Sequence, residues 1–187
     1  MEGGRPIRQL AVGDLVTARS LTPLQGEMTR LPDPAGLVHL QFRRYAGCPI
    51  CNLHLRQTTQ RHAEIAESGV TQIVVFHSTE TALRRYGADR FPFAVIADPT
   101  KNLYAEFKVE ASPHALLHPR AWLAYGRSVT AARSLKGTAD RGEQHLGLPA
   151  DFLIGSTGLV LARKYGRHAA DQWSVDELLD LTREHPV

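Results

Sequence analysis

Several features that assign a chain to a specialised class of protein are missing from this sequence. It contains no run of five like charges, and its 22 Lys and Arg nearly balance its 19 Asp and Glu. This pattern predicts neither a nucleic-acid surface nor a membrane surface. No apolar stretch approaches the ~20 residues needed to cross a bilayer, and Met1 to Pro6 include no apolar segment typical of a secretory signal. We therefore expect a cytoplasmic protein that contacts neither nucleic acid nor membrane.

Cysteine is also scarce, because the 187 residues include only Cys48 and Cys51. In a reducing compartment so close a pair does not serve as a structural staple, and a loop this short adds little stability. Catalysis, redox sensing and metal binding are the roles left for the pair. A further alternative is that both cysteines pack in the core as small hydrophobic side chains.

The composition is that of a globular protein, with 43% hydrophobic residues, and the length fits a single domain over residues 1–187. The hydrophobic pattern predicts strands and helices in alternation, which indicates βαβ units and a parallel sheet. Apolar and polar residues alternate in the first strand, which we therefore expect to be half buried. The predicted strands cover 36–42, 70–76 and 93–97, and the helices between them cover 49–68 and 79–89.

Further elements are predicted on both sides of this core. Residues 10–31 predict a small leading hairpin, and residues 151–165 a late β-hairpin. Ser174 is a typical N-cap for a last helix. Residues 111–148, rich in Pro, Gly and His, are long for a loop and predict an insertion near the active site, with one helix over 119–133.

The cysteine pair is expected at the start of a helix. Pro49 suits the first turn of a helix, which places Cys48 at or just before its N-terminus. Free N–H groups and a partial positive charge at that end stabilise a thiolate, and thiols of CxxC motifs there have lowered pKa values. Cys51 lies one turn further on, within reach to form a disulfide. Arg43 and Arg44 either favour the thiolate as well or are ordinary surface residues.

A zinc site is the competing interpretation of the same residues. Cys48, Cys51 and His54 would supply three ligands, whereas structural zinc usually takes four. No second CxxC sits at matching spacing, and His114 and His118 fall in a stretch predicted as a loop. We therefore expect neither a metal nor an organic cofactor.

Four stretches of the sequence carry a resemblance to a known family: residues 10–14 (LAVGD), 42–55 (FRRYAGCPICNLHL), 148–155 (LPADFLIG) and 171–179 (DQWSVDELL). Over nearly its whole length the chain resembles the AhpC/TSA peroxiredoxin-like proteins of the thioredoxin superfamily, especially the branch with CPxC. The resemblance implies an α/β thioredoxin-like fold, in which helices flank a central mixed sheet. It also implies reduction of peroxides through a dithiol–disulfide cycle, a thioredoxin-type reductant and, as in many relatives, a homodimer.

The resemblance leaves the attacking cysteine open. Peroxiredoxins carry a strand Phe, a Pro and then Thr-x-x-Cys, where the last residue is the peroxidatic cysteine. Laid on Phe42 to Cys51, this pattern makes Cys51 the nucleophile and puts Cys48 at the threonine. Arg44 then stands at the proline, and His54 replaces a usual Glu. Thioredoxins instead attack protein disulfides with the first cysteine of the motif. This alignment implies that Cys48 attacks and Cys51 resolves, and the placement at the helix start predicts that Cys48 is the more exposed of the two.

Pro149 is the other position that the resemblance singles out. Typical peroxiredoxins have there, three residues before Phe152, an Arg that helps hold the peroxide. Thioredoxin-like proteins have a cis-proline, which exposes backbone to a substrate disulfide, so the resemblance predicts a cis-Pro149. The alternative is an ordinary proline at the start of a strand. Arg120 or Arg127 would be substitutes for the missing charge, and a redox-sensing or zinc-binding module without turnover is the non-enzymatic alternative.

Overall fold

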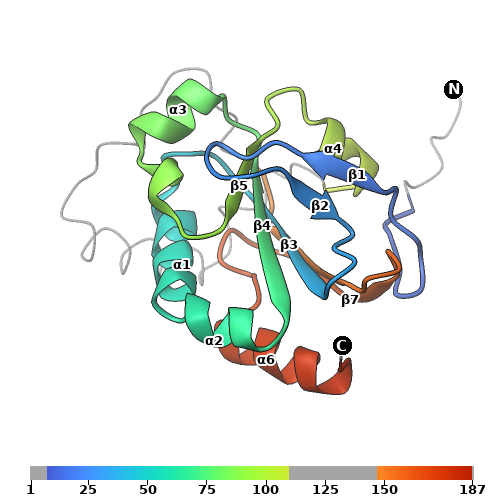
Figure 1. Cartoon of the computed structure of the whole chain (residues 1–187). Helices are drawn as coiled ribbons and strands as arrows, with labels where there is room; N and C mark the ends of the chain where they lie inside the picture. The colour runs from blue at the N-terminus through green and yellow to red at the C-terminus, as the bar shows by residue number, and fades with distance from the viewer. Residues whose placement is uncertain (1–7, 110–146, 187) are drawn as a thin grey trace, which may run out of the picture.

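The structure is a computed structural model that describes residues 8–109 and 147–186. Its centre is a five-stranded sheet with the strand order β5-β4-β3-β6-β7 (Figure 1). The three strands β3, β4 and β5 are parallel, and β6 and β7 run antiparallel to their neighbours. The predicted central mixed sheet is therefore confirmed. The strands are β3 (Leu37–Arg43), β4 (Val70–Phe76), β5 (Ala94–Ala97), β6 (Ala150–Ile154) and β7 (Val160–Tyr165).

Helical crossovers connect β3, β4 and β5. Parallel strands cannot be joined by a tight hairpin turn, so each pair needs a long connection. The crossover from β3 consists of α1 (Pro49–Gln60) and α2 (His62–Glu67). The sequence predicts one helix there, but Arg61 has φ −112° and ψ 19° and interrupts it. The crossover from β4 consists of α3 (Glu80–Arg85) and the 3₁₀ turn η1 (Ala88–Arg90).

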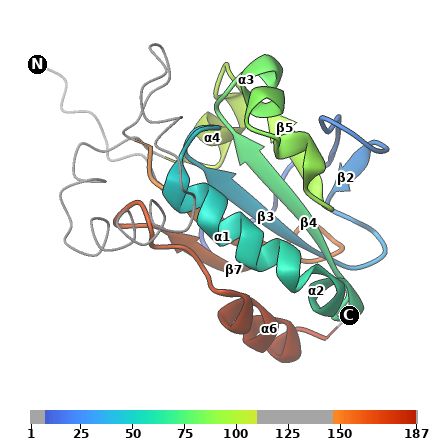
Figure 2. The same ribbon diagram turned by 90° about the vertical axis from the view of Figure 1, so that its left-hand side faces the viewer.

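Elements cover both faces of the sheet (Figures 1 and 2). Helices α1, α2 and α6 (Val175–Glu184) pack on one face, in the clusters that include Cys51, Ile65 and Leu178. The other face is covered by α4 (Asn102–Glu106) and by a hairpin of β1 (Arg19–Leu21) and β2 (Thr29–Leu31).

The flanking elements match the sequence pattern. The leading hairpin is present in the predicted range, and the late hairpin turns at Gly158, whose φ of 88° is accessible to glycine at no steric cost. Ser174 forms a capping box with Glu177 at the start of α6, as the sequence predicts. The predicted insertion over 111–148 lies outside the described residues except for Gly147 and Leu148.

The burial of β3 differs from the prediction, because all seven of its residues are buried rather than half of them. His39, Gln41 and Arg43 alternate with the apolar residues and share the face that α1 covers. These polar side chains bond to one another and to Asp151 of β6 instead of water. The alternation thus marks two buried faces of different polarity.

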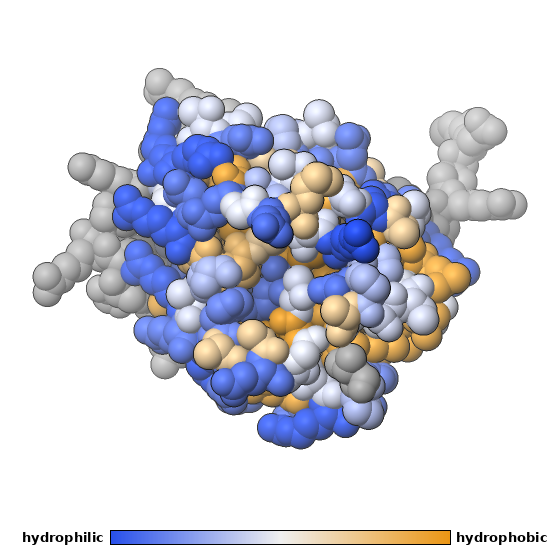
Figure 3. Space-filling view, viewed as in Figure 1, coloured by the Kyte–Doolittle hydropathy of each residue, from blue (hydrophilic) through white to orange (hydrophobic). Residues whose placement is uncertain are grey.

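On the face seen in Figure 3, hydrophilic and hydrophobic residues are mixed. Within the described ranges, the large hydrophobic side chains that are exposed are Val12, Leu15, Met28 and Leu159. Leu15 and Leu159 lie side by side, since they form an antiparallel β-bridge. None of the helices in residues 8–109 and 147–186 is long and apolar enough to cross a membrane.

Candidate active site

The two cysteines occupy the turn from β3 into α1, where the sequence predicts them. Cys48 is the N-cap of α1, and Pro49 is its first residue. The Cys48 amide donates to Tyr45 O at 3.0 Å, and its Sγ accepts from the Cys51 amide at 3.4 Å. Ala46 is held on both sides, because its N–H donates to Ser78 Oγ and its carbonyl accepts from Asn52 Nδ2. Hydrogen bonds to Ser78 and Asn52 therefore order the turn in the closed structure.

Both thiols are free and fully buried. The expectation that Cys48 is the more exposed cysteine is wrong. As the N-cap, its side chain folds back over the first turn of α1 to reach the Cys51 amide, so it lies inside the apolar cluster around that turn. The two thiols contact each other, with Cys48 as donor to Cys51. Proximity at a helix start, the condition for reversible disulfide formation, is met.

The pKa values of the two thiols are shifted in opposite directions. Burial opposes ionisation of Cys51, but the hydrogen bond from Cys48, the charge of Arg44 and the Arg44 backbone N–H outweigh it and lower the pKa of Cys51 to about 7. Burial and the adjacent Cys51 sulfur raise the pKa of Cys48 well above its usual value. Cys48 therefore keeps its proton and donates a hydrogen bond to the Cys51 thiolate.

Arg44 and Arg43 are both buried, at 2% and 0% exposure, so the surface interpretation is wrong for both. Arg44 Nη1 lies 3.7 Å from Cys48 Sγ, and its guanidinium lies 5.3 Å from the centre of the Tyr45 ring. Arg43 points instead along the buried face of the sheet, where it donates to Gln41 at 2.6 Å and to Asp151 at 2.8 Å. Of the two arginines, Arg44 is thus the one whose guanidinium contacts a cysteine sulfur.

Asp151 is a residue of the site region that the sequence reasoning missed. Besides Arg43, it accepts hydrogen bonds from His39 Nε2 at 3.0 Å and from the Trp173 amide at 3.3 Å. Burial would raise the pKa of Asp151, but the Arg43 charge and the His39 hydrogen bond hold it far below its usual value. The alternating polar residues His39, Gln41 and Arg43 of β3 could have indicated Asp151. Once this polar face is buried, the charge of Arg43 needs a carboxylate on a neighbouring strand.

His54 lies one turn after Cys51 on α1 and is buried at 8% exposure. Burial and the Arg43 charge lower the pKa of His54 to about 3, so the imidazole is neutral. Its Nε2 has no hydrogen-bond partner in the described ranges. Nowhere in those ranges do three or more His, Cys, Asp or Glu side chains gather as a metal site. The three ligands of the competing zinc interpretation, Cys48, Cys51 and His54, are therefore not brought together as a metal site in those ranges.

The peptide bond before Pro149 is trans, so the expected cis-proline is wrong; within the described ranges the cis peptide is Leu31–Pro32. The Pro149 carbonyl accepts from the Gly166 amide at 2.8 Å, which continues the pairing of β6 with β7 by one step. Pro149 is therefore an ordinary proline before a strand. Arg120 and Arg127, like His114 and His118, lie outside the described residues.

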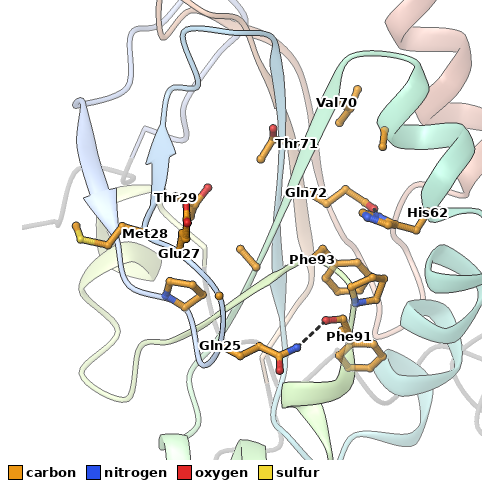
Figure 4. A pocket seen from close by; sticks show the side chains of 15 residues that line it. Gln25, Glu27, Met28, Thr29, His62, Val70, Thr71, Gln72, Phe91 and Phe93 are labelled. Carbon is orange, nitrogen blue, oxygen red and sulfur yellow. Dashed lines mark hydrogen bonds between the residues drawn. The ribbon is translucent and has the colours of Figure 1, made fainter.

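An open pocket of about 660 Å³ lies elsewhere, beneath the tip of the leading hairpin (Figure 4). Its walls come from the hairpin, α2, the start of β4 and the segment before β5. Gln25 Nε2 donates to Phe91 O at 3.2 Å, and His62 Nδ1 lies 3.0 Å from Gln72 Oε1. Neither cysteine lines it, so the pocket does not belong to the thiol site.

A reduced thiol pair at the first turn of a helix after a central strand defines a thiol-based oxidoreductase of thioredoxin-like fold. The chain matches the model of the AhpC/TSA family over residues 12–163 and belongs to that family. The resemblance seen in the sequence is thereby confirmed. Comparison with curated protein sequences gives no match.

Solved structures with the same fold share little sequence with the chain. The peroxidoxin BcpB from Mycobacterium tuberculosis is 19% identical, with a TM-score of 0.65 over 94% of this chain and 98% of that one. Mycobacterium tuberculosis AhpC is 14% identical, with a TM-score of 0.65 over 94% and 93%. A putative thiol:disulfide interchange protein DsbE from Chlorobium tepidum is 19% identical, with a TM-score of 0.59 over 93% and 99%. These similarities confirm the thioredoxin-like fold.

Proposed function

We propose that the protein is a peroxidase of the peroxiredoxin type, in which Cys51 attacks the peroxide and Cys48 resolves. The observation that carries this proposal is the direction of the bond between the sulfurs: Cys48, although its Sγ accepts from the Cys51 amide and Arg44 Nη1, keeps its proton and donates to Cys51. Cys51 receives hydrogen bonds from the Cys48 thiol and the Arg44 backbone, together with the charge of the Arg44 side chain. Because the thiolate is the nucleophilic form, the sulfur that holds the charge near neutral pH is the one that attacks.

The proposed cycle has three steps, all on the same pair of cysteines. The Cys51 thiolate attacks one oxygen of a peroxide ROOH, the O–O bond breaks, and Cys51 becomes a sulfenic acid while RO⁻ takes up a proton and leaves as ROH. The Cys48 thiol then attacks that sulfur, and a disulfide forms with release of water. A thioredoxin-type dithiol returns the pair to the reduced state by thiol–disulfide exchange and is itself oxidised to a disulfide.

Access to the sulfurs requires local opening of the turn, because neither has exposed surface. The helix start is a natural place for such opening, since the first turn of a helix has the fewest internal hydrogen bonds. The proposal also includes a cytoplasmic location. It further includes a homodimer, in which the exposed apolar side chains of Val12, Leu15 and Leu159 would be buried.

Direct exchange with protein disulfides is the second candidate. The observation in its favour is that a cysteine, Cys48, stands where peroxiredoxins have threonine, so that the site is a dithiol of the CxxC kind. The structural neighbour named as a thiol:disulfide interchange protein has the same fold. In this version the low-pKa thiol attacks a substrate disulfide, and the other cysteine releases the mixed disulfide.

Peroxide consumption coupled to thioredoxin and its reductase separates the two candidates, with reduction of insulin disulfides as the parallel assay. We expect peroxide turnover for the native protein, and none for Cys51→Ser. Cys48→Ser should form one sulfenic acid per chain, trapped by dimedone and assigned to Cys51 by mass spectrometry. Turnover no faster than that of the Cys48→Ser/Cys51→Ser variant would eliminate the peroxidase, and insulin reduction without it would establish the exchange activity.

A further inference from the structure

The peptide that joins Arg43 to Arg44 lies between two packed clusters on opposite faces of the sheet. Tyr104 of α4 belongs to one cluster, where its ring packs edge-on against Phe42 at 4.9 Å. Cys51 belongs to the cluster on the other face. This peptide marks the end of β3, so both clusters meet its polar groups there.

The Tyr104 hydroxyl is fixed at the ends of two strands. It is buried, it donates to Arg43 O, and it lies 2.9 Å from Val75 O. The hydroxyl thus bonds to the carbonyls of Arg43 and Val75 at the ends of β3 and β4. The backbone of His77 supplies a hydrogen bond to the hydroxyl oxygen. The hydroxyl therefore has both a donor and acceptors in place and cannot turn away without losing them.

The geometry of a trans peptide links this hydroxyl to the thiolate. The C=O of Arg43 and the N–H of Arg44 belong to one planar unit and point in opposite directions. A carbonyl held on the Tyr104 side thus directs the N–H to the other side, where the Arg44 backbone bonds to Cys51. Hydrogen bonds in such a chain also polarise one another, so donation to the carbonyl strengthens the N–H as a donor.

We propose that Tyr104 is a positioning residue for the Cys51 thiolate: its hydroxyl holds the Arg43–Arg44 peptide so that the N–H points at the sulfur. This inference rests on the proposed function only in taking Cys51 as the attacking thiol. Tyr104 touches neither substrate nor sulfur in this role and acts through the peptide alone.

The test is the pH midpoint for alkylation of Cys51 by iodoacetamide, with each cysteine quantified by mass spectrometry, in the native protein and in Tyr104→Phe. We expect a midpoint near 7 in the native protein. In Tyr104→Phe it should rise by about 0.5 to 1 pH unit, which lowers the thiolate fraction at acidic pH about threefold to tenfold. Because alkylation of the buried sulfur requires local opening of the turn, a matched control variant has to separate an effect on the thiolate from a general loss of fold stability.

Tyr165→Phe is the matched control. Its hydroxyl also donates to a backbone carbonyl, Phe107 O at 2.6 Å, and its ring packs against Phe152 beside the cluster that contains Tyr104. This variant loses the same kind of hydrogen bond away from the cysteines, so the Cys51 midpoint should stay at the native value. Equal midpoints in the native protein and Tyr104→Phe, or equal rises in both variants, would overturn the proposal.

A second variant covers the case in which Tyr104→Phe does not fold. Site-specific replacement of Tyr104 by 3,5-difluorotyrosine keeps the ring and makes the hydroxyl a stronger donor, so the Cys51 midpoint should fall. An unchanged or raised midpoint would contradict the proposal. A native protein in which Cys48, rather than Cys51, titrates near neutral pH would instead refute the nucleophile assignment of the proposed function.

Discussion

The Arg43 guanidinium donates to the Asp151 carboxylate at 2.8 Å across β3 and β6, and neither side chain has any exposed surface. A buried charge that loses its partner is strongly destabilising. Asp151→Asn removes the negative charge and leaves Arg43 uncompensated in the core. We expect the free energy of unfolding, measured by urea denaturation of the reduced protein, to fall by about 3 to 5 kcal/mol.

An exposed ion pair supplies the comparison for this variant. Arg61 bonds to Asp176 at 2.6 Å, but the Asp176 side chain is 79% exposed. Asp176→Asn removes the same carboxylate charge in water, where it is already solvated and screened. Its unfolding midpoint should match that of the native protein. Similar losses in both variants would mean that the Arg43–Asp151 pair has no special role in the fold.

Local signals in the sequence predict most of the fold. The β-branched run over 70–76, the cap at Ser174 and the proline after Cys48 each act within a few residues, and each element forms where they indicate. The burial of β3 could not be predicted in this way. Its polar face is covered because the chain returns as β6, more than a hundred residues later, and brings Asp151 beside Arg43.

The site was predictable to a similar extent. Sequence places the dithiol at a helix start, which the structure confirms, but it leaves open which sulfur carries the charge. That choice depends on the direction of the Arg44 N–H and on the Arg44 side chain, and thus on packing by Tyr104 from a distant helix. No short motif encodes such a contact, because its partners are brought together only by the folded sheet.

The lowered pKa of the buried His54 leads us to expect that the folded protein loses stability in acid. Burial and the Arg43 charge lower its pKa to about 3 in the folded chain, against about 6.5 when unfolded. The unfolded state thus takes up a proton first, and stability present above pH 6.5 is lost as the pH falls. The contribution reaches about 3 kcal/mol at roughly pH 4.5. His54→Gln should flatten the fall in unfolding free energy between these pH values by this amount; parallel curves would contradict the buried neutral imidazole.

The thiol pair predicts a maximum in the stability of the reduced protein at about pH 8.5. The folded pKa of Cys51 is about 7, below the ~8.5 of a free thiol, so its contribution is absent in acid and grows as the pH rises toward 8.5. The raised pKa of Cys48 has the reverse sign and begins to cost stability above about 8.5. Unfolding free energy should therefore rise by about 1 kcal/mol from pH 6.5 to roughly 8.5 and then fall. The rise should vanish in Cys51→Ser, and its persistence there would assign it to another group.

Arg44 and Arg43 are both buried, but we expect Arg44 to control mainly the pKa of Cys51 and Arg43 mainly the stability of the fold. Arg44→Gln removes the guanidinium charge near the sulfurs but keeps the backbone N–H, so the pH midpoint for alkylation of Cys51 should rise by about one pH unit. Arg43 contributes less to the lowered pKa of Cys51, because Arg44 supplies the larger charge effect.

Arg43→Gln should therefore move the Cys51 midpoint less than Arg44→Gln does. It leaves Asp151 without its counter-charge, so its main effect should be a loss of unfolding free energy of several kcal/mol, about that of Asp151→Asn. Urea denaturation and site-resolved alkylation of both variants give the two readouts. A larger rise of the midpoint in Arg43→Gln would reverse the roles of the two arginines and with them the electrostatic basis for placing the thiolate on Cys51.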